Sequence, residues 1–327
     1  MKSTLLEILG ADFPLVQAGM GGVAGIELAS AVSNAGCAGT LGLYRCPSAH
    51  IPELLRATLD RTSAPVAVNF VPEVVSEEWL TEQVRAVLGF APANTYFSFF
   101  GIPPRPLCDA LHDAHRVNVV QVGTPVQAER AAQFGADALI LQGIESGGHH
   151  LGNCTAAELL ARTRDRLRDV PLLVAGGVSS GSDLARLERL GADGCVCGTL
   201  FAASAESAAH PRYKACITRA HAADTVITDV FSVGWPGRSH RVLRNRTVEQ
   251  QGRLPANFLG VTRAYGQMHV VPRYSAAVPT VETTGPVEEM ALYCGTSCEG
   301  INAVRPVVDI IAEFRHAYRR ATVNAEC

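Results

Sequence analysis

The stretch PLLVAGGVSSGSDLARLERLGADGCVCGTL, residues 171–200, decides the fold class. It begins with an apolar run at 171–175, continues through a glycine-rich loop and a helix-like segment at 182–190, and ends in a second apolar run at 194–197. Near-continuous apolar runs are typical of parallel strands that are buried on both faces. The stretch therefore predicts one strand–helix–strand unit of a parallel sheet.

The same alternation fills the first 200 or so residues. Six further apolar runs predict strands at 14–18, 38–41, 65–70, 95–100, 117–122 and 138–142. Helices are predicted between them at 25–35, 48–62, 76–88, 104–114, 125–134 and 155–168. Eight such units favour a (β/α)8 TIM barrel, with an open doubly wound sheet as the alternative.

The pattern changes after residue 205. Trp235-Pro236-Gly237 predicts a sharp turn, and basic residues gather nearby at Arg238, Arg241, Arg244 and Arg246. We interpret this cluster either as a solvated face or as an anion-binding patch. We predict that residues 1–205 and 287–327 form the barrel, with a C-terminal helix at 304–318. Residues 206–286 are predicted to form an appended lobe that covers the active site.

Composition narrows the class of protein. The chain has 327 residues, 47% of them hydrophobic, and 28 basic against 31 acidic side chains give a net charge of −3. This composition excludes a disordered chain, and the absence of strongly basic clusters argues against nucleic acid as a partner. No apolar run approaches the ~18 residues that a membrane span needs. Ten cysteines without metal-like spacing indicate reduced thiols and a cytoplasmic protein.

In a parallel barrel the active site is built from the loops that follow the strands. Gly19 and Met20 follow the first strand, where glycine permits a close approach of the backbone to a flat ligand and Met offers a polarizable contact. Asn69 ends the third strand, and its amide suits the edge of a heterocycle or a loop backbone. The glycine-rich loops at Gly176-Gly177 and Gly198-Thr199, after strands seven and eight, predict a phosphate site at two helix N-termini.

The loop after the sixth strand, residues 142–152, carries an acid and the adjacent pair His149-His150 among four glycines. A histidine here can exchange a proton near neutral pH. Adjacent histidines on a loop do not serve one ligand easily, so we do not expect a metal site. The alternative is that both are surface residues of a flexible loop.

This loop resembles the "QG-x-E-A-G-G-H-x-G" signature of the nitronate monooxygenases, with Ser146 in place of Ala and Leu151 as an extra residue. The segments 14–22, 175–177 and 198–199 are also similar to that family, in the same order, as is the tail at 291–295. The resemblance implies a barrel that holds non-covalent FMN, with His149 as the catalytic histidine. It implies that the flavin ring, ribityl chain and phosphate contact Gly19, Met20, Asn69, Gln121, Gln142, Gly147, Gly148, Gly176, Gly177, Gly198 and Thr199.

The resemblance further implies a reaction of an alkyl nitronate with O2 to give a carbonyl compound and nitrite. Flavin-dependent enoyl-acyl-carrier-protein reductases have nearly the same loop, so an NAD(P)H-dependent reductase is the alternative. A second alternative is a flavin-binding barrel without activity. The expected partners are a small-molecule substrate and O2, with a homodimer as one assembly to test. We expect His149 to reach the substrate and His150 to project toward solvent or the lobe. Tyr265, Tyr274 and Tyr293 are candidates for lid or wall residues, or for ordinary packing.

Overall fold

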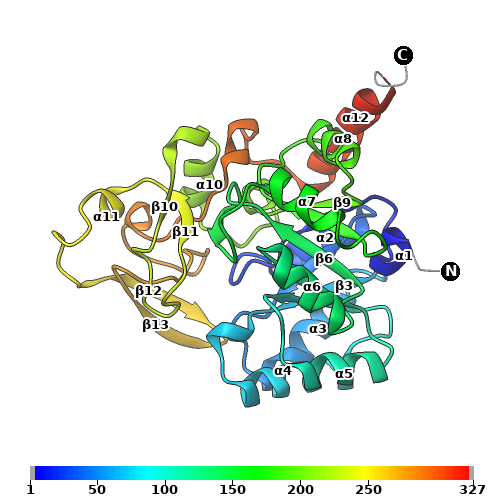
Figure 1. The fold of residues 1–327 in the computed structure, drawn as a ribbon. Helices are drawn as coiled ribbons and strands as arrows, with labels where there is room; N and C mark the ends of the chain where they lie inside the picture. Colours follow the sequence, from blue (N-terminus) through cyan, green and yellow to red (C-terminus); the bar gives the residue numbers. More distant parts are fainter. Residues whose placement is uncertain (1–3, 324–327) are drawn as a thin grey trace.

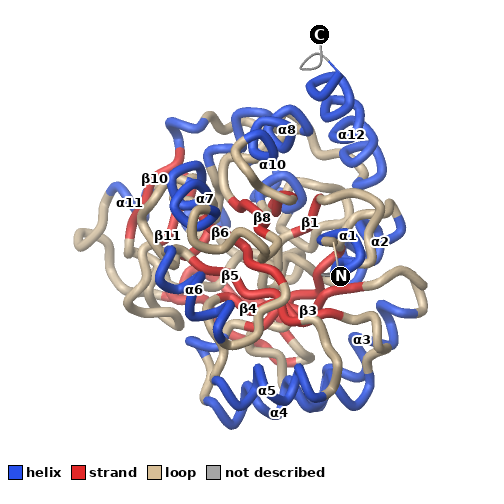
Figure 2. The backbone as a smooth tube through the Cα atoms, turned by 45° about the vertical axis from the view of Figure 1, so that its right-hand side comes forward, coloured by secondary structure: helices blue, strands red, loops and turns tan. Residues whose placement is uncertain are grey.

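A computed structural model describes residues 4–323 and shows a closed parallel barrel (Figure 2). Its strands are β1 (Leu15–Gln17), β2 (Gly39–Gly42), β3 (Val66–Phe70), β4 (Tyr96–Phe100), β5 (Asn118–Val122), β6 (Ala138–Gln142), β8 (Leu172–Ala175) and β9 (Gly194–Cys197). They are hydrogen-bonded in the order β1-β9-β8-β6-β5-β4-β3-β2. A parallel bridge between Val16 and Ala38 joins β1 back to β2 and closes the ring. The TIM barrel and all eight predicted strands are therefore confirmed, and the open sheet is not found.

The helices of the barrel surround the strands. They are α1 (Leu5–Leu9), α2 (Ile26–Asn34), α3 (Ile51–Leu59), α4 (Glu77–Phe90), α5 (Arg105–Asp113), α6 (Pro125–Gln133), α7 (Ala156–Arg164), α8 (Gly181–Arg189), α9 (Thr199–Ala202) and α12 (Val307–Val323). Short 3-10 helices lie at Ser48–His50 (η1), Pro72–Val74 (η2), Ala222–Asp224 (η3), Val287–Glu289 (η4) and Thr296–Gly300 (η5). The seven predicted helices between strands are confirmed. The tail helix α12 packs along α8 and ends at Val323, five residues beyond the predicted end.

A repeated Gly-Ala-Asp sequence closes two of the helix-to-strand turns at the base of the barrel. Gly135 and Gly191 have φ of 84° and 97°, which glycine adopts without steric cost. The carboxylates of Asp137 and Asp193 accept backbone N–H groups from the first residues of β5 and β8, at 2.8 and 2.7 Å. The same three residue types therefore fasten two neighbouring parts of the sheet.

The barrel buries its apolar side chains on both faces of the sheet. Cys195 and Cys197 of β9 are packed in the large cluster between strands and helices. The cysteines within residues 4–323 are all free thiols, as predicted, and Cys327 lies outside the described residues. Along this described part of the chain, no helix is both long and apolar enough to cross a membrane.

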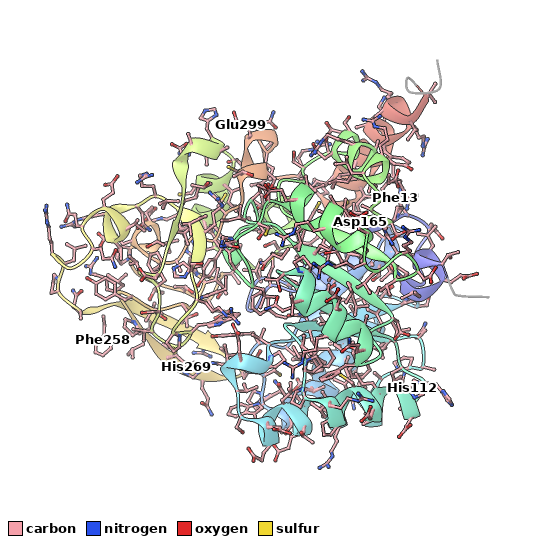
Figure 3. All side chains as sticks on the ribbon, viewed as in Figure 1. Phe13, His112, Asp165, Phe258, His269 and Glu299 are labelled. Carbon is pink, nitrogen blue, oxygen red and sulfur yellow. The ribbon has the colours of Figure 1, made fainter. Side chains whose placement is uncertain are left out.

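Residues 206–286, the segment predicted to form a lobe and called the lobe below, lie beside the barrel at the end where β6 gives way to its loop (Figure 1). Its elements are α10 (Pro211–Ile217), β10 (Thr225–Thr228), β11 (His240–Leu243), α11 (Arg246–Glu249), β12 (Phe258–Ala264) and β13 (Gln267–Pro272). Strand β11 pairs with β10 on one side and with β7 (Gly148–His149), from the loop after β6, on the other. The tip of the β12–β13 hairpin reaches the barrel, where the Tyr265 hydroxyl donates to the carbonyl of Tyr44 at 3.2 Å. Phe258 and His269 lie on the exposed surface of the hairpin (Figure 3). These strands were not predicted from sequence, because they are short and the lobe has no repeating pattern.

Candidate active site

The carboxyl ends of the barrel strands carry the loops that hold the predicted site residues. The loops after β6 and β8 touch: a Cβ added to Gly176 would lie 3.0 Å from the backbone N of Ser146. A Cβ added to Gly147 would lie 2.6 Å from the backbone N of Gly295, which precedes η5. Glycine at these positions therefore allows three backbone segments to meet at one corner of the barrel mouth.

Two hydrogen bonds from Gln142 hold the backbone around His149. Gln142 ends β6 and is 5% exposed. Its Nε2 donates to the carbonyl of His149 at 2.8 Å, and its Oε1 accepts from the N–H of Leu151 at 2.9 Å. Both ends of the amide are thus used by the loop, which makes Gln142 a positioning residue for His149 in this structure.

The His149 side chain lies in an aromatic enclosure and is only 5% exposed. Its ring stacks on the indole of Trp235, with centroids 3.8 Å apart and planes 13° apart. The rings of His240 and Tyr293 lie 4.9 and 5.3 Å away. The Nε2 atom is buried and has no hydrogen-bond partner among residues 4–323. A buried polar atom without a partner is costly and marks a position where a ligand group would be expected.

Burial determines the charge of this histidine. Loss of solvent, with smaller contributions from the nearby His240, His150 and Arg238, lowers the pKa of His149 to about 3. His149 is therefore neutral at physiological pH. It can act as a base or as a neutral hydrogen-bond donor without first losing a proton.

His240 is held as a neutral ring by its own contacts. Its Nδ1 lies 3.2 Å from the carbonyl of Arg238, and its Nε2 accepts the N–H of Phe231 at 3.2 Å. The acceptor role of Nε2 requires the proton on Nδ1. Both nitrogens are thus engaged, and His240 serves as packing beside His149.

The neighbouring His150 was expected to project toward solvent or the lobe, and the structure places it against the lobe. Its ring is 4% exposed, and its Nε2 lies 2.9 Å from the carbonyl of Ser146, within the same loop. Its backbone N–H donates to Ser239 of the lobe at 2.9 Å. A solvent-facing His150 is therefore wrong, because the lobe closes over this side of the loop.

The loops after β8 and β9 form a cradle that suits an anion. Gly176 and Gly177 have φ of 114° and 71°, and the N–H groups of Gly177 and Val178 have no hydrogen bond to any residue in 4–323. The first N–H groups of α9, opened by Gly198, also lack partners within the helix. The Thr199 hydroxyl accepts the N–H of Gly295 at 2.9 Å, which leaves its proton to donate. Such groups fit a phosphate.

The loop after β1 borders this cradle. The Met20 sulfur lies 3.8 Å from the position of a Cβ on Gly198. Gly19 lies directly against Asn69, since a Cβ on Gly19 would come within 2.6 Å of three atoms of that side chain. The Asn69 amide has only long contacts, at 3.4 and 3.5 Å, to Ser98. Its hydrogen-bonding capacity is therefore mostly unused by protein.

Gln121 lies on β5 and lines a small cavity of about 10 Å3 inside the barrel, together with Gly19 and Ser98. The structure thus brings Gly19, Met20, Asn69, Gln121, Gly176, Gly177, Gly198 and Thr199 to one end of the barrel, and places Gly147, Gly148 and His149 on its rim. No group of three or more metal-ligating side chains is found within residues 4–323.

The arginine cluster does not form one surface. Arg238 pairs with Glu73 at 2.6 Å, and Arg246 pairs with Glu289 at 3.3 Å. Arg241 donates inward, to the carbonyl of Ile144 at 3.0 Å. Arg244 and Arg246 are exposed, so the interpretation as a solvated face holds for these two. Arg238 and Arg241 serve separate contacts within the protein, so the four side chains do not form one anion-binding patch.

Residues that sequence reasoning missed lie around His149. Trp235 was interpreted only as part of a turn, although its indole covers the histidine. Tyr44 and Glu73, which follow β2 and β3, contact that indole. Their place directly after barrel strands is the signal that could have found them. Of the three candidate tyrosines, Tyr293 is a wall residue beside His149, whereas the hydroxyls of Tyr265 and Tyr274 bond to the carbonyls of Tyr44 and Leu254.

Comparison with known proteins identifies the family. The family model described as nitronate monooxygenase matches residues 2–316. The chain belongs to the nitronate monooxygenase family. It is 30% identical over 291 residues to the nitronate monooxygenase of Pseudomonas aeruginosa, covering 75% of this chain and 81% of that protein. The resemblance drawn from the sequence is confirmed, and this family member is an oxidoreductase of the monooxygenase type.

This nitronate monooxygenase family member is also similar to proteins that carry other names. It is 31% identical over 276 residues to a (3aS,4S,5R,7aS)-5-hydroxy-7a-methyl-1-oxo-octahydro-1H-indene-4-carboxyl-CoA dehydrogenase of Mycobacterium tuberculosis, covering 82% of this chain and 74% of that one. FabK from Thermotoga maritima has a similar structure, with a TM-score of 0.82 at 26% identity over 98% of this chain and 97% of that one. A nitroalkane oxidase from Streptomyces ansochromogenes has a TM-score of 0.80 at 25% identity over 99% and 100%.

Proposed function

We propose that this protein is an FMN-dependent nitronate monooxygenase in which His149 exchanges the substrate proton. The observation that carries the proposal is the neutral, buried His149, whose Nε2 has no partner within residues 4–323 and which lies at the barrel mouth. When bound, FMN supplies the redox chemistry that links oxidation of the nitronate to reduction of O2.

The glycine cradle supports the cofactor assignment. The N–H groups of Gly177 and Val178, the start of α9 and the Thr199 hydroxyl would hold the phosphate of FMN. Gly19, Met20, Asn69 and Gln121 would contact the remainder of the cofactor from within the mouth. Gln142, Gly147 and Gly148 would act mainly by shaping the loop that carries His149.

The residues around the histidine define its task. Gln142 fixes the backbone, and Trp235, His240 and Tyr293 exclude water from the ring. In this dry setting the neutral imidazole accepts the α-proton of a neutral nitroalkane, which leaves the nitronate, or donates a hydrogen bond from Nε2 to a nitronate oxygen, according to its tautomer. We also propose that residues 206–286 act as the unit that covers the site, with residues 1–205 and 287–327 as the barrel.

An enoyl-thioester reductase is the second candidate, supported by the likeness to FabK. The monooxygenase and the reductase are distinguished by the compound that reduces the flavin of the purified yellow protein under anaerobic conditions. A nitronate that bleaches the flavin anaerobically, with nitrite released after O2 is admitted, supports the monooxygenase. Rapid bleaching by NAD(P)H alone, with colour restored by an enoyl thioester and no nitrite from any nitronate, would replace it with the reductase. A CoA thioester belongs in the same test because of the Mycobacterium relative.

Flavin content is tested first. We expect one FMN per chain, released on denaturation. A colourless protein that does not bind added FMN would reject the cofactor and the activity together.

A further inference from the structure

The indole of Trp235 occupies the space over His149. With ring centroids 3.8 Å apart and planes 13° apart, nothing fits between the two rings. The other flanks of the imidazole face His240 and Tyr293. A substrate that stacks on His149 must therefore take the place of the indole.

One carboxylate holds the indole in place. Trp235 Nε1 donates to Glu73 Oε1 at 2.6 Å, and Arg238 donates to the same carboxylate at 2.6 to 3.1 Å. Glu73 lies in η2, directly after β3, so it fastens the lobe to the barrel mouth. The indole also stacks on Tyr44, with centroids 5.7 Å apart, and meets the edge of Phe100 at 5.3 Å.

The turn that carries Trp235 is loosely packed. Gly234 and Gly237 flank the segment and have φ of 93° and 77°. A Cβ added to either glycine would meet no other atom within 4 Å in the part of the structure that is described. The backbone before Trp235 is held by hydrogen bonds of Val233 with Tyr274 and Ala276, each at 2.9 Å, and by the carbonyl of Gly234, which accepts from Arg45 Nη2 at 2.6 Å. The residues that flank Trp235 are thus exposed, and a swing of the indole away from His149 breaks chiefly its contacts with Glu73, Tyr44 and Phe100.

We propose that Trp235 is a specificity-determining residue whose indole fills the substrate position over His149, is held there by Glu73, and is displaced by a planar substrate group. The proposal deepens the proposed function and rests on it for the identity of the substrate. A hydrogen bond to a charged group shifts an equilibrium such as that between the indole over His149 and the displaced indole by about 10- to 150-fold. The Glu73 contact thus sets how readily the position is vacated.

The first test needs no turnover. Trp79 and Trp235 are the two tryptophans, so Trp79→Phe leaves Trp235 as the single fluorescent reporter. In that background we expect Glu73→Ala to raise the acrylamide quenching constant of Trp235 at least twofold, with Glu73→Gln between the two. Glu129→Ala, which removes an exposed carboxylate paired with Arg166 at 3.0 Å, is the matched control and should change nothing. Equal quenching in Glu73→Ala and its parent would overturn the proposal.

The second test uses substrate size. For the nitronates of phenylnitromethane and nitroethane, Trp235→Ala should raise the ratio of kcat/KM values in favour of the larger by about tenfold, while Trp235→Phe should keep most of the discrimination. An unchanged ratio in Trp235→Ala would also overturn the proposal. If the purified protein oxidises no nitronate, the proposed function fails, and the quenching experiment alone decides whether Glu73 holds Trp235 over His149.

Discussion

Replacing Gln142 by leucine tests how the catalytic loop is positioned. The substitution keeps the size of the side chain but leaves the carbonyl of His149 and the N–H of Leu151 without partners in a buried setting. Each unsatisfied group costs about 1–3 kcal/mol, so we expect the free energy of unfolding to fall by about 2–6 kcal/mol. A loop displaced by ~1 Å would in addition lower turnover about 100-fold.

Gln142→Glu separates the two bonds. A carboxylate still accepts from Leu151, but it can donate to the carbonyl of His149 only when protonated. The pKa of the new side chain should therefore be raised in the folded state. Because the pKa is raised in the folded state, the protonated side chain stabilises the fold at low pH, and this contribution to the free energy of unfolding is lost as the pH rises through the folded-state pKa. Urea unfolding from pH 5 to 8, with kcat measured alongside, should show this loss for Gln142→Glu and not for the wild type.

A carboxylate at the base of the barrel gives the control. Asp193 accepts the N–H of Leu172 at 2.7 Å and pairs with Arg164 at 2.5 Å, far from the loop after β6. Asp193→Ala should lose comparable stability with unchanged kcat. If Gln142→Leu unfolds within about 0.5 kcal/mol of the wild type and turns over normally, the positioning role of Gln142 is refuted.

Three further outcomes are expected. His149→Asn should lower turnover about 10²- to 10⁴-fold with flavin still bound, whereas His150→Asn should stay within roughly tenfold, and equal losses would shift the catalytic role between them. Burial lowers the pKa of His149 to about 3, whereas its unfolded pKa is near 6.5, so its contribution to the free energy of unfolding is present above pH 6.5 and is lost on acidification. Urea titrations should show that the free energy of unfolding falls by about 2 kcal/mol by pH 5, and by less in His149→Gln. Gly177→Asp should weaken FMN binding ~1,000-fold by placing a carboxylate at the phosphate, and full flavin content after purification would show that Gly177 does not face it.

The barrel was predictable because each strand is a short run of apolar residues that must be buried on both sides. The chain direction predicted that the candidate site lies at the carboxyl ends of the strands. It also predicted that the loop with Gly176 and Gly177, which follows a strand, lies at that end of the barrel. His149 was predictable for the same reason, since it follows a strand and stands among glycines.

The enclosure of His149 was not predictable in the same way. Trp235 comes from a lobe without repeating hydrophobicity, and its contact with Glu73 joins residues 162 positions apart. Gln142 was expected to contact the flavin on the strength of the resemblance alone, and its partners within the protein depend on a turn that sequence does not specify. His150 was placed partly in solvent because nothing in its own segment indicates that Ser239 lies against it.

The pairing of β7 with β11 has a consequence for how the enzyme is made. His149 pairs with His240, a residue that leaves the ribosome about 90 positions later. At ~5–20 residues per second, the segment that carries the histidine waits roughly 5–20 seconds for its partner strand. The glycine cradle at 176–199 is synthesised within that interval. The residues of the anion cradle are therefore complete in the nascent chain before the strand that pairs with the segment of His149 has been made.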